Sequence, residues 1–260
     1  MKIRDALREA EQRLEAAGID TPRVDAEHLL AHVAGTTRSG VYAQLDRDVD
    51  GVVEPLLRRR EAREPLAYVL GSWGFRRLTL KTDARALVPR PETETVVERC
   101  LALLEGSASP RVLDIGVGSG AIALALKDEC PQAQVTGVDV SQPALELARE
   151  NAAALGLDVE LRSGDVDVAS EGWDLVVSNP PYVDSLESLQ PELQFEPERA
   201  LVGTGMHEAI ARAARTRFLV FEVGDGQAAE VVRVLDTVGY RDVVITADLS
   251  GRERVVEGRR

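Results

Sequence analysis

The sequence predicts an α/β fold, a mostly parallel sheet with helices on both faces, preceded by a small helical domain. From residue 111 onward, strand and helix patterns alternate, which is typical of a doubly wound parallel sheet. A glycine-rich stretch at residues 116–120 joins the first of these strands to the helix that follows it. Residues 1–70, by contrast, contain amphipathic helical patterns and no strand signal. The 260 residues are enough for one large α/β domain and this smaller one.

Helices in the N-terminal part are predicted at residues 2–17, at residues 22–35, and around residues 52–57 with an end before Pro65. Ile3, Leu7 and Leu14 fall on one stripe of the first helix, which can face a core. Thr21 and Pro22 suit the N-cap and the first position of the second helix. We therefore expect a small domain of packed helices.

The pattern changes between the helical part and the α/β part. Residues 75–80 alternate between apolar and polar side chains, and residues 86–88 are apolar after a polar segment, so we expect a β-hairpin. Pro91 and the acidic residues after it predict a helix start, and the helix continues to Leu104. The predicted domain boundaries are 1–70 for the helical domain, 71–90 for the linker and hairpin, and 91–260 for the α/β domain.

The α/β part should contain seven strands. They are predicted at residues 111–115, 133–138, 158–161, 173–178, 217–222, 240–246 and 254–257. Helices are predicted between them at residues 120–129, 142–154, 206–214 and 226–238. Only the short turn at residues 248–251 separates the last two strands, so one of them should be antiparallel.

Composition narrows the class of protein. A hydrophobic content of 44% supports a real core, and no apolar run is long enough to span a membrane. The first nine residues mix charges with apolar residues and lack the apolar centre of a signal peptide, so we expect a cytoplasmic protein. The formal charge of −13 opposes binding to a phosphate backbone. We interpret the basic cluster at Arg58–Arg60 and Arg63 as a solvated helix face.

Metal and redox chemistry have little support in the sequence. Cys100 and Cys130 lack the spacing of a metal site or a redox motif, so we interpret them as core residues in a reducing compartment. His28 and His32 are four residues apart on one helix, but no third ligand accompanies them. We predict no metal site.

The glycine-rich stretch has the form of a nucleotide-binding corner. Residues 111–115 form a strand that runs directly into Gly116-Val117-Gly118-Ser119-Gly120 and then into a helix. Glycines there permit positive φ and a close approach of a ligand to the backbone. Ala121 stands where a dinucleotide fingerprint has its third glycine, and that variant is allowed, so this spacing alone does not exclude NAD.

Polar side chains follow several strands at the predicted carboxyl edge of the sheet. Asp114 lies inside the first strand, where a carboxylate can hold the turn or reach a ligand's ammonium group. Asp139 ends the second strand, where it can accept hydrogen bonds from both ribose hydroxyls. Asp165 follows the third strand and Asn179 the fourth. Because parallel sheets bind ligands at this edge, the combination favours a methyl-donor site over a simple tight turn.

Asn179-Pro180-Pro181-Tyr182 leaves the fourth strand as a rigid loop. Proline fixes φ and restricts the residue before it, so this loop can neither continue the strand nor begin a helix at Asn179. It holds an amide side chain and backbone carbonyls beside an aromatic ring. Such a loop can receive a planar group that carries an NH2. On its own the tetrapeptide is equally compatible with a polar turn beside a packed tyrosine.

Together these motifs resemble a known family. Residues 114–120, with Asn-Pro-Pro-Tyr at 179–182, resemble the amino-group branch of the S-adenosylmethionine-dependent methyltransferases. Val-Pro-Arg-Pro-Glu-Thr-Glu at residues 88–94 narrows the resemblance to the release factor glutamine methyltransferases, the PrmC or HemK family. The resemblance covers nearly the whole chain, including Asp-Ala-Glu-His-Leu-Leu at residues 25–30.

The resemblance implies a fold, a reaction and a cofactor. The fold is a Rossmann-like class I methyltransferase with a mostly parallel seven-stranded sheet, plus a small N-terminal helical domain. We expect this domain to recognise the substrate protein, and the alternative is a structural cap on the sheet. The reaction methylates the side-chain nitrogen (N5) of the glutamine in the Gly-Gly-Gln motif of class 1 peptide chain release factors. The methyl donor is S-adenosyl-L-methionine and the product is S-adenosyl-L-homocysteine. We expect a monomer with no direct nucleic-acid partner and no membrane partner.

The resemblance also implies site residues by position. The methyl donor would be held by Asp114, Gly116, Val117, Gly118, Ser119, Gly120, Asp139, Asp165, Val166 and Asn179. The glutamine would be held by Asn179, Pro180, Pro181, Tyr182 and Phe75, of which Asn179, Pro180 and Tyr182 would be catalytic. Val166 departs from the family, which often has an aromatic residue there. The segment before the strand at 217 is also altered, so we expect a shortened loop or helix there with the fold retained.

An amide nitrogen is a poor nucleophile, whereas the methyl donor is a sulfonium that needs little activation. We therefore expect the enzyme to act mainly by positioning and electrostatics. The Asn179 side-chain oxygen and the Pro180 backbone oxygen would accept the two N–H bonds of the substrate amide. Tyr182 and Phe75 would pack against the glutamine. No general base is expected, because the proton can leave after methyl transfer.

Three other functions compete with this one. A ribosomal-protein glutamine N5-methyltransferase would use the same acceptor loop. An adenine-N6 nucleic-acid methyltransferase would also fit it, but such enzymes must flip out a base and hold phosphates, which the net charge opposes. A nucleotide-binding oxidoreductase or a non-catalytic binding protein would leave the Asn-Pro-Pro-Tyr loop without a role.

Overall fold

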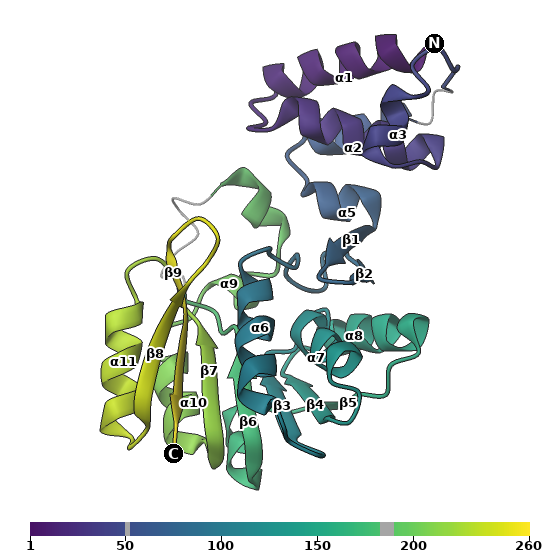
Figure 1. Ribbon diagram of the computed structural model, residues 1–260. Coiled ribbons are helices and arrows are strands. Elements are labelled where there is room, and N and C mark those ends of the chain that lie inside the picture. Colours follow the sequence, from purple (N-terminus) through teal and green to yellow (C-terminus); the bar gives the residue numbers. More distant parts are fainter. Residues whose placement is uncertain (50–52, 183–189) are drawn as a thin grey trace. The chain divides into compact units, whose positions relative to one another are not determined.

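The computed structural model describes residues 1–49, 53–182 and 190–260. The chain forms two compact units, each with its own core. The first unit comprises Met1–Ser72 together with Gln190–Phe195, and the second comprises Trp73–Leu189 and Glu196–Arg260. In Figure 1, residues 1–72 of the first unit run from purple to blue and its residues 190–195 are green, while the end of the second unit is yellow.

The first unit is helical, as predicted. In its described part the helices are α1 (Ile3–Ala16), α2 (Pro22–Ala34), α3 (Arg38–Tyr42), α4 (Val53–Glu61) and α5 (Leu66–Leu70), with a 3-10 turn, η2 (Pro191–Phe195). Ile3, Leu7 and Leu14 of α1 are all buried, which confirms the predicted apolar stripe. The short helices α3 and α5 were not predicted, because each is about one turn long and carries no repeated apolar spacing.

Ion pairs attach the segment 190–195 to the helices of the first unit. The buried Arg60 side chain lies 2.7 Å from Asp25 and 3.0 Å from Glu192, and Arg63 lies 2.8 Å from Glu192. A guanidinium group has enough donors to serve two carboxylates at once, which offsets the cost of its burial. The prediction of a solvated basic face is therefore right for Arg58, which is 73% exposed, and wrong for Arg60.

A β-hairpin precedes the large sheet, but its strands differ from the predicted ones. The pair is β1 (Ser72–Phe75) and β2 (Leu78–Lys81), joined by a tight turn in which Arg76 has a φ of +50°. Residues 86–88 form no strand. The apolar side chains of Ala86 and Val88 are buried all the same. Their apolar pattern therefore reflects burial of a loop and not the pairing of a β-strand.

The second unit contains a seven-stranded sheet formed by described residues, in the order β5-β4-β3-β6-β7-β9-β8. Its strands are β3 (Arg111–Ile115), β4 (Gln134–Asp139), β5 (Glu160–Ser163), β6 (Trp173–Ser178), β7 (Thr216–Glu222), β8 (Arg241–Ala247) and β9 (Glu253–Arg259). The pairs from β5 to β7 are parallel, and β9 is antiparallel to both β7 and β8. The mostly parallel sheet with an antiparallel strand near its end is confirmed.

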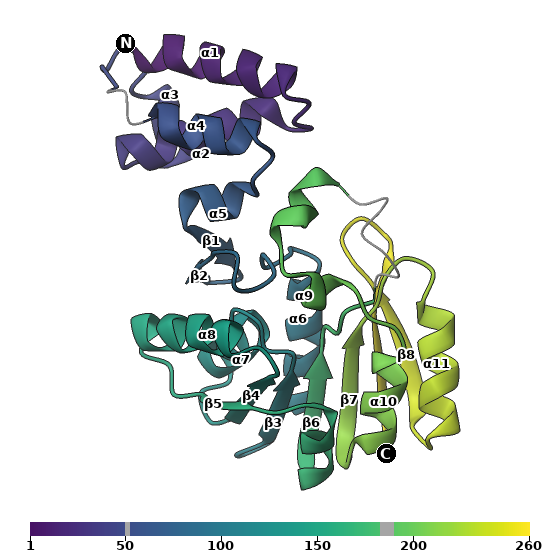
Figure 2. The ribbon, with the colours of Figure 1, turned by 180° about the vertical axis from the view of Figure 1, so that it is seen from behind.

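Helices cover both faces of this sheet. They are α6 (Thr93–Leu104), α7 (Ala121–Glu129), α8 (Gln142–Leu155), α10 (Met206–Ala213) and α11 (Ala228–Thr237), with a 3-10 helix, η1 (Val166–Glu171). A further short helix of this unit is α9 (Glu198–Leu201). Figure 1 shows α6 in front of the sheet, and Figure 2, from behind, shows α10 in front of it. The helices predicted between strands agree with these to within two residues. Only Ala214 and Arg215 separate α10 from β7. That this connection is shorter than in the family stays a prediction.

The two faces of the sheet carry two separate cores because strand residues alternate. In β7, Phe218 and Val220 point to the core beneath α6 and α7, while Leu219 and Phe221 point to the core beneath α10 and α11. Side chains in a strand alternate with a period of two, so a strand buried on both faces must be apolar throughout. The described part of the chain holds no helix with the length and apolarity that a membrane crossing requires.

Candidate active site

Strand register brings the predicted motifs together at one edge of the sheet. Ile115 at the end of β3 pairs with Val138 of β4 on one side and with Ser178 of β6 on the other. The residues that follow, Gly116 and Asn179, therefore leave neighbouring strands side by side. The chain winds from β3 toward β5 and then restarts at β6, so the two loops diverge at the switch point where open α/β sheets bind ligands.

A cavity of about 620 Å3 opens at this edge. Of the predicted site residues, its walls include Asp114, Gly116, Val117, Gly118, Ser119, Asp139, Asp165, Asn179 and Pro181. Those not brought into its walls are Gly120, Val166, Pro180, Tyr182 and Phe75. Phe75 is 1% exposed within the core beneath α6, and Val166 packs on the opposite core. Most of the predicted donor residues thus share one cavity, and Phe75 does not belong to it.

The glycine corner depends on backbone conformations that other residues rarely adopt. Gly118 has a φ of +54° and Gly120 a φ of +89°. A Cβ atom on Gly120 would lie 2.8 Å from the Leu124 side chain, so this position also needs glycine for packing. Gly120 therefore shapes the turn into α7, although it does not face the cavity.

Asp114 keeps one carboxylate oxygen without a partner. Its Oδ2 accepts a hydrogen bond from the Ala123 amide in the first turn of α7, at 3.1 Å. Its Oδ1 is buried and has no hydrogen-bond partner among the described residues. Burial raises the pKa of Asp114 to about 7. The hydrogen bond from the Ala123 amide acts to lower this pKa, and the Asp139 charge acts to raise it. A cationic ligand group in the cavity would supply the missing partner and favour the ionised form.

Asp139 orders the backbone around the cavity. Its Oδ2 accepts from the Gly118 amide at 3.0 Å, and its Oδ1 accepts from the Ser141 amide at 2.8 Å. A carboxylate oxygen has two lone pairs, so each still has room for one hydroxyl donor. Two neighbouring hydroxyl groups, as on a ribose, fit this arrangement. The residues of the corner thus fit a ligand with both an ammonium group and a diol.

The Asn-Pro-Pro-Tyr loop is held at both ends. At its start, the Asn179 Nδ2 group lies 3.4 Å from the Thr93 Oγ1. At its end, the Gln227 side chain donates to the Tyr182 carbonyl at 2.9 Å. The Tyr182 ring packs on Gly224, where a Cβ would come within 2.9 Å of it. These contacts fix the loop from α6 and from the segment after β7.

Tyr182 stays a neutral phenol at physiological pH. Burial raises the pKa of Tyr182 to about 12, and the nearby Glu222 carboxylate adds to the rise. A neutral ring can pack against a guest, but its hydroxyl is a poor base at pH 7. The raised pKa of Tyr182 therefore agrees with a site in which this residue is not a general base.

Glu222 is a buried carboxylate beside Asn179 that sequence reasoning missed. Ser178 pairs with Phe221 across β6 and β7, so Asn179 and Glu222 follow neighbouring positions in the sheet. The Thr93 hydroxyl donates to the Glu222 Oε2 at 2.6 Å. The signal was present, because Glu222 ends a parallel strand just as Asp139 does.

Glu196 links the segment ahead of α6 to residues 197–198, which also line the cavity. Its Oε2 accepts from the Val88 amide at 3.0 Å, and its other oxygen pairs with Arg90. The Glu196 side chain is buried, which strengthens these hydrogen bonds. The motif at residues 88–94 thus lines the cavity together with Pro197 and Glu198.

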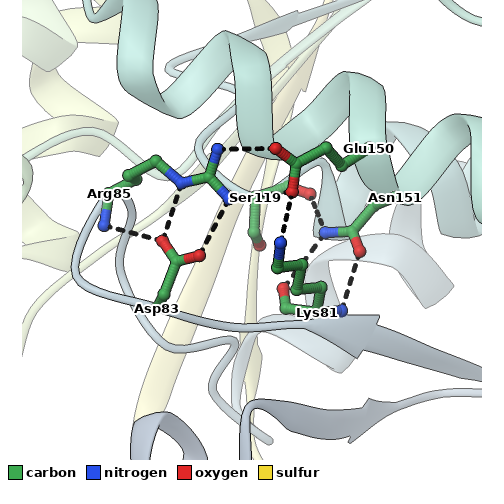
Figure 3. A network of polar contacts seen from close by, with 6 residues as sticks. All are labelled: Lys81, Asp83, Arg85, Ser119, Glu150 and Asn151. Carbon is green, nitrogen blue, oxygen red and sulfur yellow. Dashed lines mark hydrogen bonds and ion pairs between the residues drawn. The ribbon is translucent and has the colours of Figure 1, made fainter.

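Asn151 of α8 joins the hairpin to the glycine corner, as Figure 3 shows. Its Oδ1 accepts from the Lys81 amide at 2.7 Å, and its Nδ2 donates to the Lys81 carbonyl at 3.2 Å. The same Nδ2 group donates to the Ser119 carbonyl at 2.9 Å. One buried amide therefore binds two backbone segments that come from different parts of the chain.

Exposed ion pairs surround this amide. Glu150 lies 2.7 Å from Lys81 and 2.8 Å from Arg85, and Arg85 also pairs with Asp83 (Figure 3). Arg85 lines the cavity. Because these groups are partly exposed to water, their pairing contributes less to stability than the buried amide does.

We expect Asn151→Ala to destabilise the second unit by about 1–3 kcal/mol per buried polar group left unpaired. The physical reason is that the backbone groups of Lys81 and Ser119 lose their hydrogen-bond partner. Asn151 is only 2% exposed, so water does not readily replace it. Chemical denaturation measures the free energy of unfolding directly. Glu150→Ala is the matched control from the next residue of the same helix, and it should cost clearly less. An equal loss in both variants would contradict this assignment.

A second hollow of about 820 Å3 lies at the opposite edge of the sheet. It is lined by residues at the amino ends of strands, among them Arg111, Gln134, Glu160 and Trp173. None of the predicted site residues is in its walls. The chemistry-bearing residues therefore gather at the carboxyl edge.

Comparison with protein-family models gives two matches. The methyltransferase small domain matches residues 97–212, and the PrmC N-terminal domain matches residues 5–71. The two matches lie one after the other along the chain.

Full-length relatives are similar to this chain from end to end. It is 41% identical to the release factor glutamine methyltransferase of Deinococcus radiodurans over 278 aligned residues, which cover 100% of this chain and 99% of that protein. It is 41% identical to the protein of that name from Rhodospirillum rubrum, with 95% and 82% covered. For the one from Vibrio cholerae, the identity is 38% and the covered shares are 98% and 96%.

Solved structures share the fold at low identity. The human METTL16 catalytic domain, in complex with a MAT2A 3′UTR hairpin, is 16% identical with a TM-score of 0.55 over 69% of this chain and 74% of that one. The human methyltransferase 10 domain containing protein is 17% identical with a TM-score of 0.52, covering 69% and 87%. The predicted class I methyltransferase fold is thereby confirmed.

Proposed function

Because this chain belongs to the release factor glutamine methyltransferase family, we propose that its cavity binds S-adenosyl-L-methionine beside a glutamine side chain held at Asn179. The chain methylates a release factor on glutamine, the reaction of its full-length relatives. The glutamine we propose is that of the Gly-Gly-Gln motif, and the methylated atom is its side-chain nitrogen. The observation that carries the proposal is the register that places Gly116 and Asn179 on neighbouring strands.

The donor fits the residues of the glycine corner. Asp114 has an unpaired buried oxygen for the ammonium group, and Asp139 has room for the two ribose hydroxyls. Asp165 lies in the same cavity wall, near where the base would extend. When bound, S-adenosyl-L-methionine supplies a methyl group on a positively charged sulfur.

Asn179 and Pro180 orient the acceptor nitrogen. The Asn179 side-chain oxygen and the Pro180 carbonyl accept the two N–H bonds of the glutamine amide, which aims the nitrogen and stabilises the positive charge that develops on it. Tyr182 supports this loop through its packing on Gly224 and its carbonyl bond to Gln227. Phe75 is buried in the core beneath α6, so we do not place it at this acceptor site.

We also propose that the helical unit recognises the release factor protein, since the match to the PrmC N-terminal domain covers it and the cavity lies wholly in the second unit. We also propose that the enzyme works as a monomer. We place its reaction in the cytoplasm.

A panel of acceptors tests the function. Labelled methyl donor is offered with a release factor, a release factor whose motif glutamine is changed to alanine, ribosomal protein, and nucleic acid. We expect label on the unchanged release factor alone. A short peptide with the motif should show a higher KM than the whole factor if the helical unit grips the protein. Label on ribosomal protein or nucleic acid would contradict the proposal.

A further inference from the structure

We propose that Glu222 and Thr93 fix the orientation of the Asn179 side-chain amide, so that its oxygen, and not its NH2 group, meets the substrate nitrogen. This inference rests on the proposed function, since it explains how Asn179 becomes an acceptor. Glu222 is a positioning residue here, because it acts through Asn179.

An asparagine amide is nearly symmetric in shape but not in hydrogen bonding. One end accepts hydrogen bonds, and the other end donates two. A flipped Asn179 would present its NH2 group to the NH2 group of the glutamine, and two donors would then face each other. The site therefore needs neighbours that accept hydrogen bonds from Asn179.

Thr93 and Glu222 are such neighbours. The Thr93 hydroxyl lies 2.6 Å from the Glu222 Oε2, and it must be the donor because an ionised carboxylate only accepts. Because the single hydroxyl hydrogen of Thr93 is already used in the bond to Glu222, Thr93 can only accept a hydrogen bond from the Asn179 Nδ2, at 3.4 Å. The Asn179 side chain also hydrogen-bonds to Glu222. Both neighbours thus require the Nδ2 group, and Oδ1 is left for the guest.

Burial makes this requirement strict. Thr93 is 4% exposed and Glu222 is 2% exposed, so water cannot replace a lost partner. In the flipped state the Asn179 Oδ1 would face two other acceptors, Thr93 and Glu222. Both would then lack the hydrogen bond that the Asn179 NH2 group donates. An unpaired buried polar group is costly, which favours the unflipped amide.

The orientation should depend on the charge of Glu222. Burial raises the pKa of Glu222 to about 7, while the Thr93 hydrogen bond and the Arg254 guanidinium act against the rise. The other groups that face it are Glu92, Tyr182 and His207, whose Nε2 lies 2.9 Å from the Glu222 carbonyl. Below about pH 7 the protonated carboxyl can donate, and the requirement on Asn179 is lost. The kcat should therefore rise as pH rises through about 7.

The variant Glu222→Gln tests this directly. It keeps the shape but replaces one acceptor oxygen with a donor NH2 group. If Thr93 continues to donate to the remaining oxygen, the new NH2 group faces Asn179 and favours the flipped amide. We expect kcat to fall roughly 10–100-fold at saturating donor and release factor, with donor affinity unchanged. The melting temperature should stay equal or rise, because a buried charge is removed, and the rise of kcat with pH should vanish.

Glu257→Gln is the matched control. Glu257 is also a buried carboxylate of the sheet, 4% exposed, but it pairs with Arg99 at 2.7 Å and lies outside the cavity. Its kcat and pH profile should equal those of the unchanged enzyme. Wild-type kcat with an unchanged pH profile in Glu222→Gln would overturn the proposal.

An NMR measurement separates this inference from the proposed function. The side-chain NH2 signals of Asn179, assigned by their loss in Asn179→Ala, should shift around pH 7 in the wild type. In Glu222→Gln they should not. If the chemical shifts of the wild-type Asn179 NH2 group did not change with pH, the proposal would be overturned, even if Glu222→Gln failed to fold. Absence of transfer to release factor by the wild type would instead contradict the proposed function.

Discussion

We expect Asn179→Ala to abolish nearly all methyl transfer and to leave donor binding nearly intact. The change removes the oxygen that orients the substrate amide and stabilises its developing charge, and single groups of this kind are worth roughly 100- to 1,000-fold in rate. The donor contacts that we propose for Asp114 and Asp139 come from β3 and β4, and the hydrogen bonds that hold these two carboxylates do not involve the Asn179 side chain. We therefore expect kcat to fall roughly 100- to 1,000-fold, with donor Kd changed less than about threefold.

Single-turnover transfer and calorimetric titration of the donor measure these two quantities separately. Gln134→Ala is a suitable control, because it removes an exposed side-chain amide at the other end of β4. It should leave both quantities unchanged. Near-wild-type turnover in Asn179→Ala would contradict the proposed acceptor role.

Asp139→Ala should have the opposite profile. The change removes two acceptors for ribose hydroxyls and also releases the Gly118 and Ser141 amides that shape the corner. Hydrogen bonds to a charged group are worth about 1.5–3 kcal/mol each, so the loss of two should raise donor Kd by at least about 100-fold. At saturating donor, kcat should recover most of its value, since the acceptor loop is unchanged.

Two further acids calibrate this result. Asp165 lines the same cavity but is exposed and caps the Val166 amide at 2.7 Å, so Asp165→Ala should weaken donor binding less than Asp139→Ala does. Asp158 lies in the hollow at the opposite edge, and Asp158→Ala should have no effect on donor Kd. Equal donor affinity in Asp139→Ala and wild type would refute the donor assignment.

The sequence predicted that these motifs meet at one edge of the sheet, because their meeting follows from one rule of parallel sheets. Gly116, Asp139 and Asn179 each follow a strand, and the carboxyl ends of parallel strands share an edge. Register then placed them next to one another without any long-range information from side chains. The same rule, applied to β7, would have found Glu222.

Other contacts could not be predicted because they join distant parts of the chain. Thr93 and Glu222 are 129 positions apart, and Val88 and Glu196 are 108 positions apart. No local spacing reports such pairs. The hairpin was misplaced for a related reason, since the buried residues 86–88 have the apolar pattern of a strand but are held by Glu196 as a loop.

The segment 190–195 is a further example. Its sequence shows no sign that it belongs with the helices of residues 1–72. The buried Arg60 links them through Asp25 and Glu192, and an arginine in a basic cluster resembles a surface residue until its partners are known.

Tandem mass spectrometry of a release factor after incubation with the enzyme and donor tests the central claim most directly. The claim predicts one methyl group on the side-chain nitrogen of the Gly-Gly-Gln glutamine with the wild type, and none with Asn179→Ala. A methyl group on any other residue, or an unmodified glutamine under conditions in which the enzyme consumes donor, would contradict it.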